Sequence, residues 1–135
     1  MPSLLSRADA ADWSVVCLCA AWCRTCDEYR PELVALATRA PDMRFVWLDV
    51  EDDEDWIADL EIETFPTLLV LARQTPLFFG ALPPQIGVLE RTLAALREGE
   101  ARAAALEADA AEAVREIATR LAQSNLELCA ESRGP

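Results

Sequence analysis

A run of mainly apolar residues, Trp13 to Ala20, leads through only Ala21 and Trp22 into a segment with helical spacing. The run is dense in valine, cysteine and leucine, which is typical of a strand buried on both faces of a sheet. The segment from Cys23 to Thr38 carries an apolar stripe made of Tyr29, Leu33, Leu36 and Ala37. The chain therefore has a strand-to-helix junction, and a Cys-x-x-Cys sequence, Cys23 to Cys26, begins the helix.

Shorter segments continue the alternation of strands and helices. Phe45 to Val50 predicts a second buried strand, and Glu54 to Leu60 predicts a short helix, which together extend a β-α-β-α unit. Thr67 to Leu71 predicts a third strand. A short fourth strand, Leu77 to Phe79, can pair antiparallel with the third across a turn that contains Gln74, Thr75 and Pro76.

The remainder of the chain is helix-forming. One helix is expected from Gln85 onward, with a break at Gly99, and a second from about Ala101 to Leu128. The second helix has a narrow, alanine-rich stripe, which favours packing within the chain over a coiled coil. We therefore expect two units, one over residues 1–98 and a helical C-terminal extension over residues 99–135.

Composition excludes several classes of function. The 135 residues, 53% of them hydrophobic, suffice for one compact domain, and the net charge of −12 argues against nucleic acid or an anionic membrane as partner. All 12 basic residues are arginine, so lysine Schiff bases, histidine bases and histidine metal ligands are excluded. The acidic run from Asp49 to Asp55 is interpreted as a solvated loop and helix start. Without a recognisable signal peptide or a stretch of roughly 20 apolar residues, a soluble, cytoplasmic protein is expected.

The two cysteines of the junction suit redox chemistry. A cysteine at a helix N-terminus has its thiolate stabilised by unpaired backbone N–H groups and by the helix dipole. A second cysteine one turn later can resolve the mixed disulfide that such a thiolate forms, which leaves a Cys23–Cys26 disulfide. Both roles depend on this spacing.

Four short motifs in the region Asp12 to Leu96 resemble the thioredoxin family. They are the Trp-Cys entry at Ala21-Trp22-Cys23, the helix proline Pro31, the cis-proline loop Phe65-Pro66-Thr67, and the glycine turn Gly80-Ala81-Leu82. The resemblance implies an α/β, thioredoxin-like fold with a central mixed sheet of about four strands, flanked by helices and followed by the extra C-terminal helix.

The resemblance also implies a site and an activity. Cys23 would be the exposed attacking thiol and Cys26 the buried resolving thiol, while Trp22, Phe65 and a cis Pro66 would contact an extended substrate. The implied activity is that of a thiol-disulfide oxidoreductase acting in cell redox homeostasis. Its partners would be protein disulfide substrates and a dithiol electron donor, and it would need no organic cofactor or metal beyond the redox-active Cys23–Cys26 disulfide.

The sequence departs from the family at several positions. Cys17 and Trp47 stand where many thioredoxins have a buried carboxylate and its lysine partner, so proton transfer would use water or a thiol. Arg24 is expected to stabilise the Cys23 thiolate, whereas Asp27 is expected to oppose it. The family's first strand is expected to be missing. The exposed edge would then be covered by the C-terminal helix, or that helix would form a homodimer with another copy.

Alternatives to redox catalysis remain for these residues. The scaffold could serve as a non-catalytic interaction module that docks a partner protein. Cys17 and Cys19 could join Cys23 and Cys26 as zinc ligands in a C-x-C-x3-C-x2-C pattern, although we favour buried apolar filler for both, because residues of one strand converge poorly on a tetrahedral site. Cys129, near the C-terminus, is interpreted as a bystander.

Overall fold

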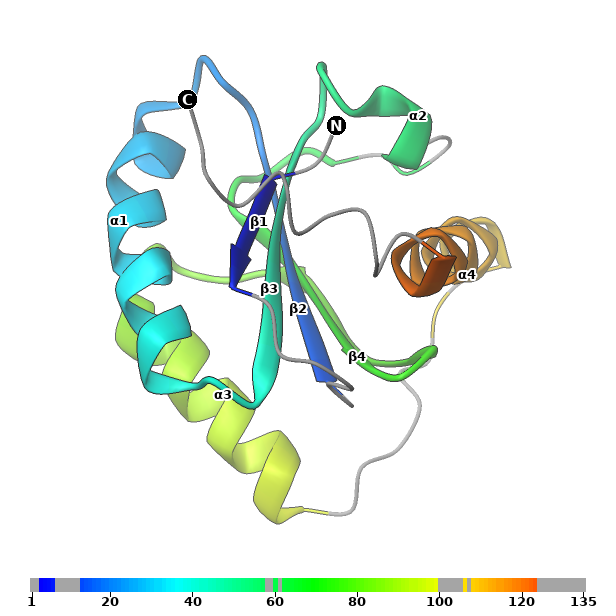
Figure 1. The fold of residues 1–135 in the computed structure, drawn as a ribbon. Coiled ribbons are helices and arrows are strands. Elements are labelled where there is room, and N and C mark those ends of the chain that lie inside the picture. Colours follow the sequence, from blue (N-terminus) through cyan, green and yellow to red (C-terminus); the bar gives the residue numbers. More distant parts are fainter. Residues whose placement is uncertain are drawn as a thin grey trace.

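The computed structural model of the chain describes residues 3–6, 13–57, 60, 62–99, 106 and 108–123. Within these residues a five-stranded mixed sheet lies between two layers of helices (Figure 1). The α/β architecture expected from the sequence, with helices flanking a mixed sheet and an extra C-terminal helix, is confirmed. None of the helices in the described part of the chain is long and apolar enough to cross a bilayer.

The strands lie in the order β1-β3-β2-β4-β5. Parallel pairing joins β2 to β3, while β2 with β4 and β4 with β5 are antiparallel pairs. Strand β2 is thus central, with neighbours on both sides, which is why its sequence is mainly apolar. The bounds of the strands are β1 Ser3–Ser6, β2 Trp13–Cys19, β3 Met43–Asp49, β4 Thr67–Ala72 and β5 Thr75–Ala81.

The expectation that no strand precedes Trp13 was wrong. Strand β1 pairs antiparallel with β3, with Ser3 opposite Trp47 and Leu4 opposite Val46. Four residues with two serines are too short to show an alternating hydrophobic pattern, so sequence reasoning overlooked them. The outer edge of β3 is therefore covered by a strand, and the sheet has five strands instead of about four.

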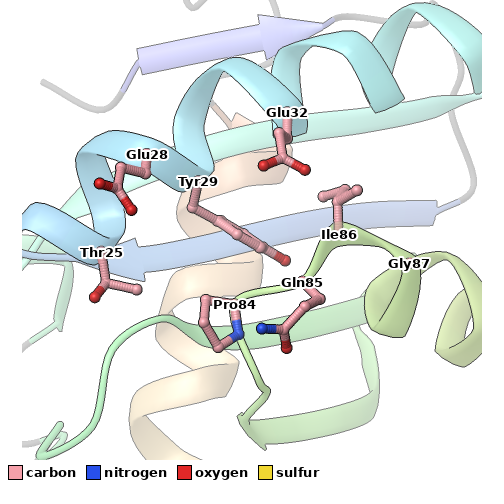
Figure 2. A pocket seen from close by; sticks show the side chains of 8 residues that line it. All are labelled: Thr25, Glu28, Tyr29, Glu32, Pro84, Gln85, Ile86 and Gly87. Atoms are coloured by element: carbon pink, nitrogen blue, oxygen red, sulfur yellow. The ribbon is translucent and has the colours of Figure 1, made fainter.

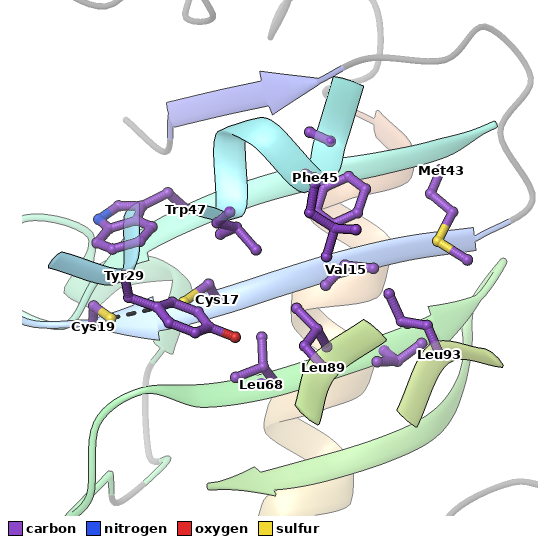
Figure 3. Packing of buried hydrophobic residues seen from close by; sticks show 14 of the residues in the cluster. Val15, Cys17, Cys19, Tyr29, Met43, Phe45, Trp47, Leu68, Leu89 and Leu93 are labelled. Atoms are coloured by element: carbon purple, nitrogen blue, oxygen red, sulfur yellow. Dashed lines mark hydrogen bonds between the residues drawn. The ribbon is translucent and has the colours of Figure 1, made fainter. Parts of the chain in front are cut away.

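Helices α1 (Arg24–Arg39) and α3 (Ile86–Glu98) cover one face of the sheet. Because side chains alternate along a strand, every second residue of β2 points to this face. The strand residues that meet the two helices here are Val15, Cys17, Cys19, Met43, Phe45, Trp47, Leu68 and Val70. We call this cluster the cysteine face of the core. Figure 3 shows how Tyr29, Leu89 and Leu93 of the helices pack onto it.

Helices α2 (Glu54–Ile57) and α4 (Ala108–Gln123) cover the opposite face. The apolar stripe of α4 packs on the strand side chains that point away from the cysteine face. The buried residues that α4 contributes here are Val114, Ile117, Ala118 and Leu121. The C-terminal helix therefore docks within its own chain, on a face of the sheet and not over an edge. A homodimer through this helix and the division at residue 98 stay predictions.

The turn after β4 and the bounds of β5 differ from those expected. The β4–β5 connection is a two-residue turn at Arg73 and Gln74, and Arg73 has a φ of 58°. Strand β5 is thus longer than the three residues predicted, since pairing with β4 supplies hydrogen bonds that local propensity does not reveal. For the second predicted C-terminal helix, the structure describes α4 over Ala108–Gln123. The ends of that prediction, near Ala101 and Leu128, lie outside the described residues, as does Cys129.

Candidate functional site at the start of helix α1

Cys23 is the N-cap residue of α1 and has extended backbone angles, φ −90° and ψ 115°. Its N–H donates to the carbonyl of Ala20 at 3.0 Å, and its carbonyl accepts from Asp27 N–H at 3.1 Å, which begins the helical ladder. The Cys23 thiol is half-buried and not in a disulfide, whereas Cys26, one turn later, is fully buried. The structure therefore places a partly exposed thiol at the start of α1 and a buried sulfur one turn later.

Cys26 is joined by a disulfide to Cys19, the last residue of β2. This corrects the expected Cys23–Cys26 pairing, and it also corrects the interpretation of Cys19 as apolar filler. Cys26 lies on the side of α1 that faces the sheet, and Cys19 points up from the same cysteine face, with 5.9 Å between the two Cα atoms. The spacing of Cys23 and Cys26 in the sequence does not reveal that Cys19 of the neighbouring strand lies within bonding distance of Cys26.

Cys17 lies next to Cys19 on the same face of β2 and is fully buried. Its Sγ is 3.7 Å from Cys19 Sγ, as the dashed line in Figure 3 marks. Burial raises the pKa of the Cys17 thiol far above its ordinary range, and the nearby Arg30 offsets this only in part. Cys17 therefore remains a protonated thiol. In the parallel register Cys17 is opposite Trp47, so the two departures from the family occupy neighbouring positions.

Arg30 covers the indole of Trp47, with 4.9 Å from the guanidinium carbon to the ring centroid. A cation over an aromatic face is stabilised by the ring quadrupole. Both side chains line a pocket of about 260 Å³ next to the site, together with Ala20, Ala21, Asp27, Asp49, Asp52 and Asp53. Of the two residues expected to tune Cys23, Asp27 thus lies on the rim of this pocket, and Arg24 is an exposed residue of the first helical turn.

The proline loop lies beside the cysteines. The Phe65–Pro66 peptide bond is cis, and Phe65 packs against the cysteine face, as does Cys23. The exposed Trp22 meets Phe65 edge to face, with 5.6 Å between the ring centroids and 86° between the ring planes. Leu82 N–H donates to the Pro66 carbonyl at 3.3 Å, which ties the loop to the residues after β5. The sequence segments carrying Trp22, Phe65 and Pro66 are thereby brought together.

The acidic segment after β3 is only partly a solvated loop. Asp49 is 8% exposed and accepts hydrogen bonds from the N–H groups of Glu51 and Asp52, at 2.8 and 3.0 Å. Asp53, also buried, accepts from Asp49 N–H at 2.8 Å. These two carboxylates organise the turn before α2, a role that aspartate favours because its side chain reaches nearby backbone donors.

A second pocket, of about 420 Å³, lies between α1 and the start of α3 (Figure 2). Tyr29 extends from α1 toward this pocket, and among the described residues its buried hydroxyl has no hydrogen-bond partner. Burial, then the nearby Cys17 and Glu32, raise the pKa of Tyr29 above its ordinary range. Sequence reasoning treated Tyr29 as a core residue only.

The zinc interpretation lacks an assembled ligand set. Two of its four sulfurs, Cys19 and Cys26, are bonded to each other. In the part of the chain that the structure describes, no group of three or more cysteine, aspartate or glutamate side chains is arranged to hold a metal ion.

A half-buried cysteine at a helix N-terminus, a buried cysteine one turn later and a cis-proline loop all contact the cysteine face of the core. A family model described as Thioredoxin matches residues 6–78. The chain belongs to the thioredoxin family.

Curated relatives are similar over part of their length. Thioredoxin domain-containing protein 2 of Mus musculus is 34% identical over 80 residues, which cover 58% of this chain and 15% of that protein. The mitochondrial Thioredoxin-3 of Saccharomyces cerevisiae is 34% identical over 59 residues, 44% of this chain and 46% of that protein. Thioredoxin H-type of Populus jackii is 30% identical over 69 residues, half of each chain. The chain thus spans half or less of these relatives.

Solved structures share the fold. The oxidized form of mitochondrial thioredoxin 3 from Saccharomyces cerevisiae superposes with a TM-score of 0.55 at 24% identity, covering 67% of this chain and 81% of that chain. Fasciola hepatica thioredoxin superposes with a TM-score of 0.57 at 24% identity, covering 62% and 80%. These similarities establish the architecture of the sheet and its helices.

Proposed function

We propose that this chain is a thiol-disulfide oxidoreductase that acts on protein disulfides, with Cys23 as the attacking thiol. The observation that carries the proposal is the position of Cys23, a half-buried free thiol at the N-cap of the 16-residue helix α1. Backbone N–H groups without helical partners and the positive end of the helix stabilise a thiolate there. Membership of the thioredoxin family supports the same chemistry.

The proposed reaction has two exchange steps. The Cys23 thiolate attacks one sulfur of the substrate disulfide, forms a mixed disulfide and releases the other sulfur as a thiol. Cys26, when reduced, then attacks Cys23 Sγ and releases the second substrate sulfur. The substrate gains two electrons and two protons, and the protein is left with a Cys23–Cys26 disulfide. A dithiol donor of the cytoplasm would reduce this disulfide again, in the service of cell redox homeostasis.

An extended segment of the substrate would lie along the proline loop. Trp22 is 66% exposed and rests edge to face on Phe65, which creates an apolar ledge beside Cys23. Pro66 has no N–H and shapes the backbone at this point, so Phe65 is the loop residue that can offer backbone hydrogen bonds to a substrate strand. Arg24 would favour the Cys23 thiolate and Asp27 would oppose it.

Single cysteine variants of the full chain test the proposal. Reduction of a disulfide-bonded peptide is followed with dithiothreitol as electron donor. We expect the rate with Cys23→Ser to fall to that of dithiothreitol alone, because a serine hydroxyl does not attack disulfides. We expect Cys26→Ser to accumulate the peptide as a mixed disulfide on Cys23. Cys129→Ser is the matched control and should keep the wild-type rate. An active Cys23→Ser variant would refute the proposal.

A non-catalytic docking module is the second candidate, and the Cys19–Cys26 disulfide favours it because this bond withholds the resolving thiol. The pH dependence of iodoacetamide alkylation distinguishes the two candidates. An attacking cysteine is alkylated well below the pH at which a free thiol of pKa about 8.5 reacts, whereas the cysteine of a docking module has no such requirement. The wild type is compared with Cys23→Ser, so that the signal of Cys23 is isolated.

A further inference from the structure

Four cysteines gather around the start of α1, two more than the proposed exchange reaction uses. Cys23 and Cys26 come from the helix, and Cys17 and Cys19 come from β2. All four belong to or pack against the cysteine face of the core. Among them only Cys23 has a partly exposed side chain.

We propose that Cys26 has two alternative disulfide partners, Cys23 and Cys19, and that its transfer to Cys19 switches the protein from releasing a bound substrate to retaining it. The switch rests on the proposed function, since it acts on the resolving thiol of that reaction. Cys19 is thereby assigned as a redox residue of the site.

The backbone holds Cys19 close enough to Cys26 to compete with Cys23 for its sulfur. Its Cα lies 5.9 Å from that of Cys26, within the range of about 4.4–6.8 Å that a disulfide spans. Cys19 is paired with Asp49 of β3, and Val50 N–H donates to the Cys19 carbonyl at 2.8 Å, so hydrogen bonds fix the backbone at Cys19. Cys26 is fully buried and faces the sheet, which presents its sulfur to the strand.

The exchange is balanced without an external oxidant. After turnover, Cys19 loses its proton and attacks Cys26 Sγ in the Cys23–Cys26 disulfide. The Cys19–Cys26 bond forms as the bond to Cys23 breaks, and Cys23 leaves as a thiolate that takes up a proton. One disulfide is broken and one is made, so the oxidation state of the cluster is unchanged.

Cys17 acts as a positioning residue in this exchange. Its Sγ lies 3.7 Å from Cys19 Sγ, and because Cys19 is in a disulfide, Cys17 supplies the S–H of that contact. A thiol that stays protonated can donate in the same way to a Cys19 thiolate. It would stabilise the charge on Cys19 as that sulfur attacks or leaves.

The second disulfide changes what Cys23 can do. With Cys26 bonded to Cys19, Cys23 can still attack a disulfide and hold the partner as a mixed disulfide. The remaining neighbour, Cys17, is fully buried next to Cys19 and protonated, so it does not take over the role of resolving thiol. The disulfide exchange thus converts a site that releases its product into one that retains it.

Disulfide mapping tests the switch on the intact chain. Reduced wild-type protein is oxidised with diamide, and its free thiols are alkylated in acid. Chymotrypsin and trypsin then cut after Trp22 and Arg24, which separates Cys23 and Cys26 from each other and from the peptide that carries Cys17 and Cys19. We expect the Cys19–Cys26 peptide to be the major product, with Cys23 alkylated. Cys26 joined only to Cys23, or joined to no cysteine, would overturn the proposal.

Variants sharpen the mapping. Cys17→Ala should keep the Cys19–Cys26 peptide, whereas Cys19→Ala should lose it and yield Cys23–Cys26 in its place. Because Cys19→Ala alters the core, Cys23→Ser provides a second route, and there Cys19–Cys26 should still form. If oxidised Cys23→Ser contains no such bond, the switch is refuted.

A reaction with glutathione disulfide measures whether the Cys19–Cys26 bond makes Cys23 retain its partner. Oxidised wild type mixed with glutathione disulfide should retain glutathione on Cys23, and oxidised Cys19→Ala should not, since a Cys23–Cys26 disulfide leaves no attacking thiol. If oxidised wild type contains the Cys19–Cys26 bond but carries no glutathione on Cys23, then Cys23 is not a nucleophile. That result would contradict the proposed function. If the wild type reduces the peptide normally but Cys26 is found bonded only to Cys23, the proposed switch is refuted and the proposed function stands.

Discussion

Arg44 of β3 donates a hydrogen bond from Nη2 to the backbone oxygen of Leu121 in α4, with 2.6 Å between the two atoms and a separation of 77 positions in the sequence. Arg44 is 7% exposed, so this bond is shielded from water. Carbonyls in the last turn of a helix lack intrahelical partners, and a cationic donor is a favourable one. The bond anchors the end of α4 to the centre of the domain.

Replacing this arginine should weaken the whole fold. We expect Arg44→Ala to lower the free energy of unfolding by about 1.5–3 kcal/mol, the range for hydrogen bonds to charged groups. Urea denaturation followed by tryptophan fluorescence measures the change. Arg115→Ala, on the exposed side of α4, is the control and should stay within about 0.5 kcal/mol of wild type. Equal effects of the two variants would contradict an anchoring role for Arg44.

The apolar stripe of α4 should contribute still more. Ile117 is fully buried against the sheet, and Ile117→Ala should cost about 2–5 kcal/mol of unfolding free energy because it leaves a cavity. Glu112→Ala, on the exposed side of the same helix, removes a side chain without creating a cavity and serves as the control. A loss below about 1 kcal/mol for Ile117→Ala would mean that α4 is loosely packed.

A chain that ends at Leu96 tests the predicted division between residues 1–98 and 99–135. Without α4, the sheet face formed by Val16, Leu18, Val46, Leu48, Leu69 and Leu71 loses its cover. We expect this shortened chain to self-associate in sedimentation and to bind a hydrophobic dye, because large apolar patches rarely remain exposed on monomers. A fragment as monomeric and stable as the full chain would show that the extension is dispensable.

The buried hydroxyl of Tyr29 should be a net cost to stability at neutral pH. Because no described residue bonds to it, Tyr29→Phe is expected to raise the free energy of unfolding by about 1–3 kcal/mol, the cost of an unsatisfied buried polar group. A drop in stability on this substitution, measured by urea denaturation, would instead indicate a hydrogen bond to water in the adjoining pocket.

Tyr29 should also contribute to alkaline unfolding. Its pKa in the folded state is raised above the ordinary value of 10.0, so folding favours the neutral phenol. The stabilisation that this raised pKa gives to the folded state is complete below pH 10.0. It is lost as the pH rises from there toward the folded-state pKa. The stability of wild type should thus decline faster than that of Tyr29→Phe in this range. Parallel declines would contradict the assignment.

The exposed ion pair of Asp42 and Arg97 should make stability depend on pH in the acid range. Arg97 donates a hydrogen bond to the Asp42 carboxylate and thereby lowers the pKa of that carboxyl from 3.8. Its contribution is present above pH 3.8 and is lost as the pH falls through the lowered pKa. Since both side chains are largely exposed, Asp42→Asn should cost at most about 1 kcal/mol at neutral pH.

Acid titrations of the two proteins check this prediction. The stability difference between wild type and Asp42→Asn should vanish once Asp42 is protonated. High salt should reduce the same difference at neutral pH, because exposed charges are screened. A difference that persists in strong acid would point to packing as its source.

Local patterns were sufficient for the main strands, for α1 and α3, and for the loop around Pro66. A continuous apolar run predicts a central strand because both of its faces must be buried, and this argument needs no knowledge of neighbours. The short edge strand β1 and the length of β5 were not predictable in this way. Their hydrogen bonds come from β3 and β4, so tertiary context outweighs their weak propensity.

The sequence alone determined that a cysteine begins a helix directly after a buried strand, with a second cysteine one turn later. Alternation along that strand also determined that Cys17 and Cys19 share a face. Only the tertiary structure decided which sulfur Cys26 meets, that Asp49 and Asp53 are buried, and that α4 covers its own sheet. Such contacts depend on how helix and sheet pack in three dimensions, and a disulfide follows the distance between Cα atoms, which the spacing of cysteines in a sequence does not encode.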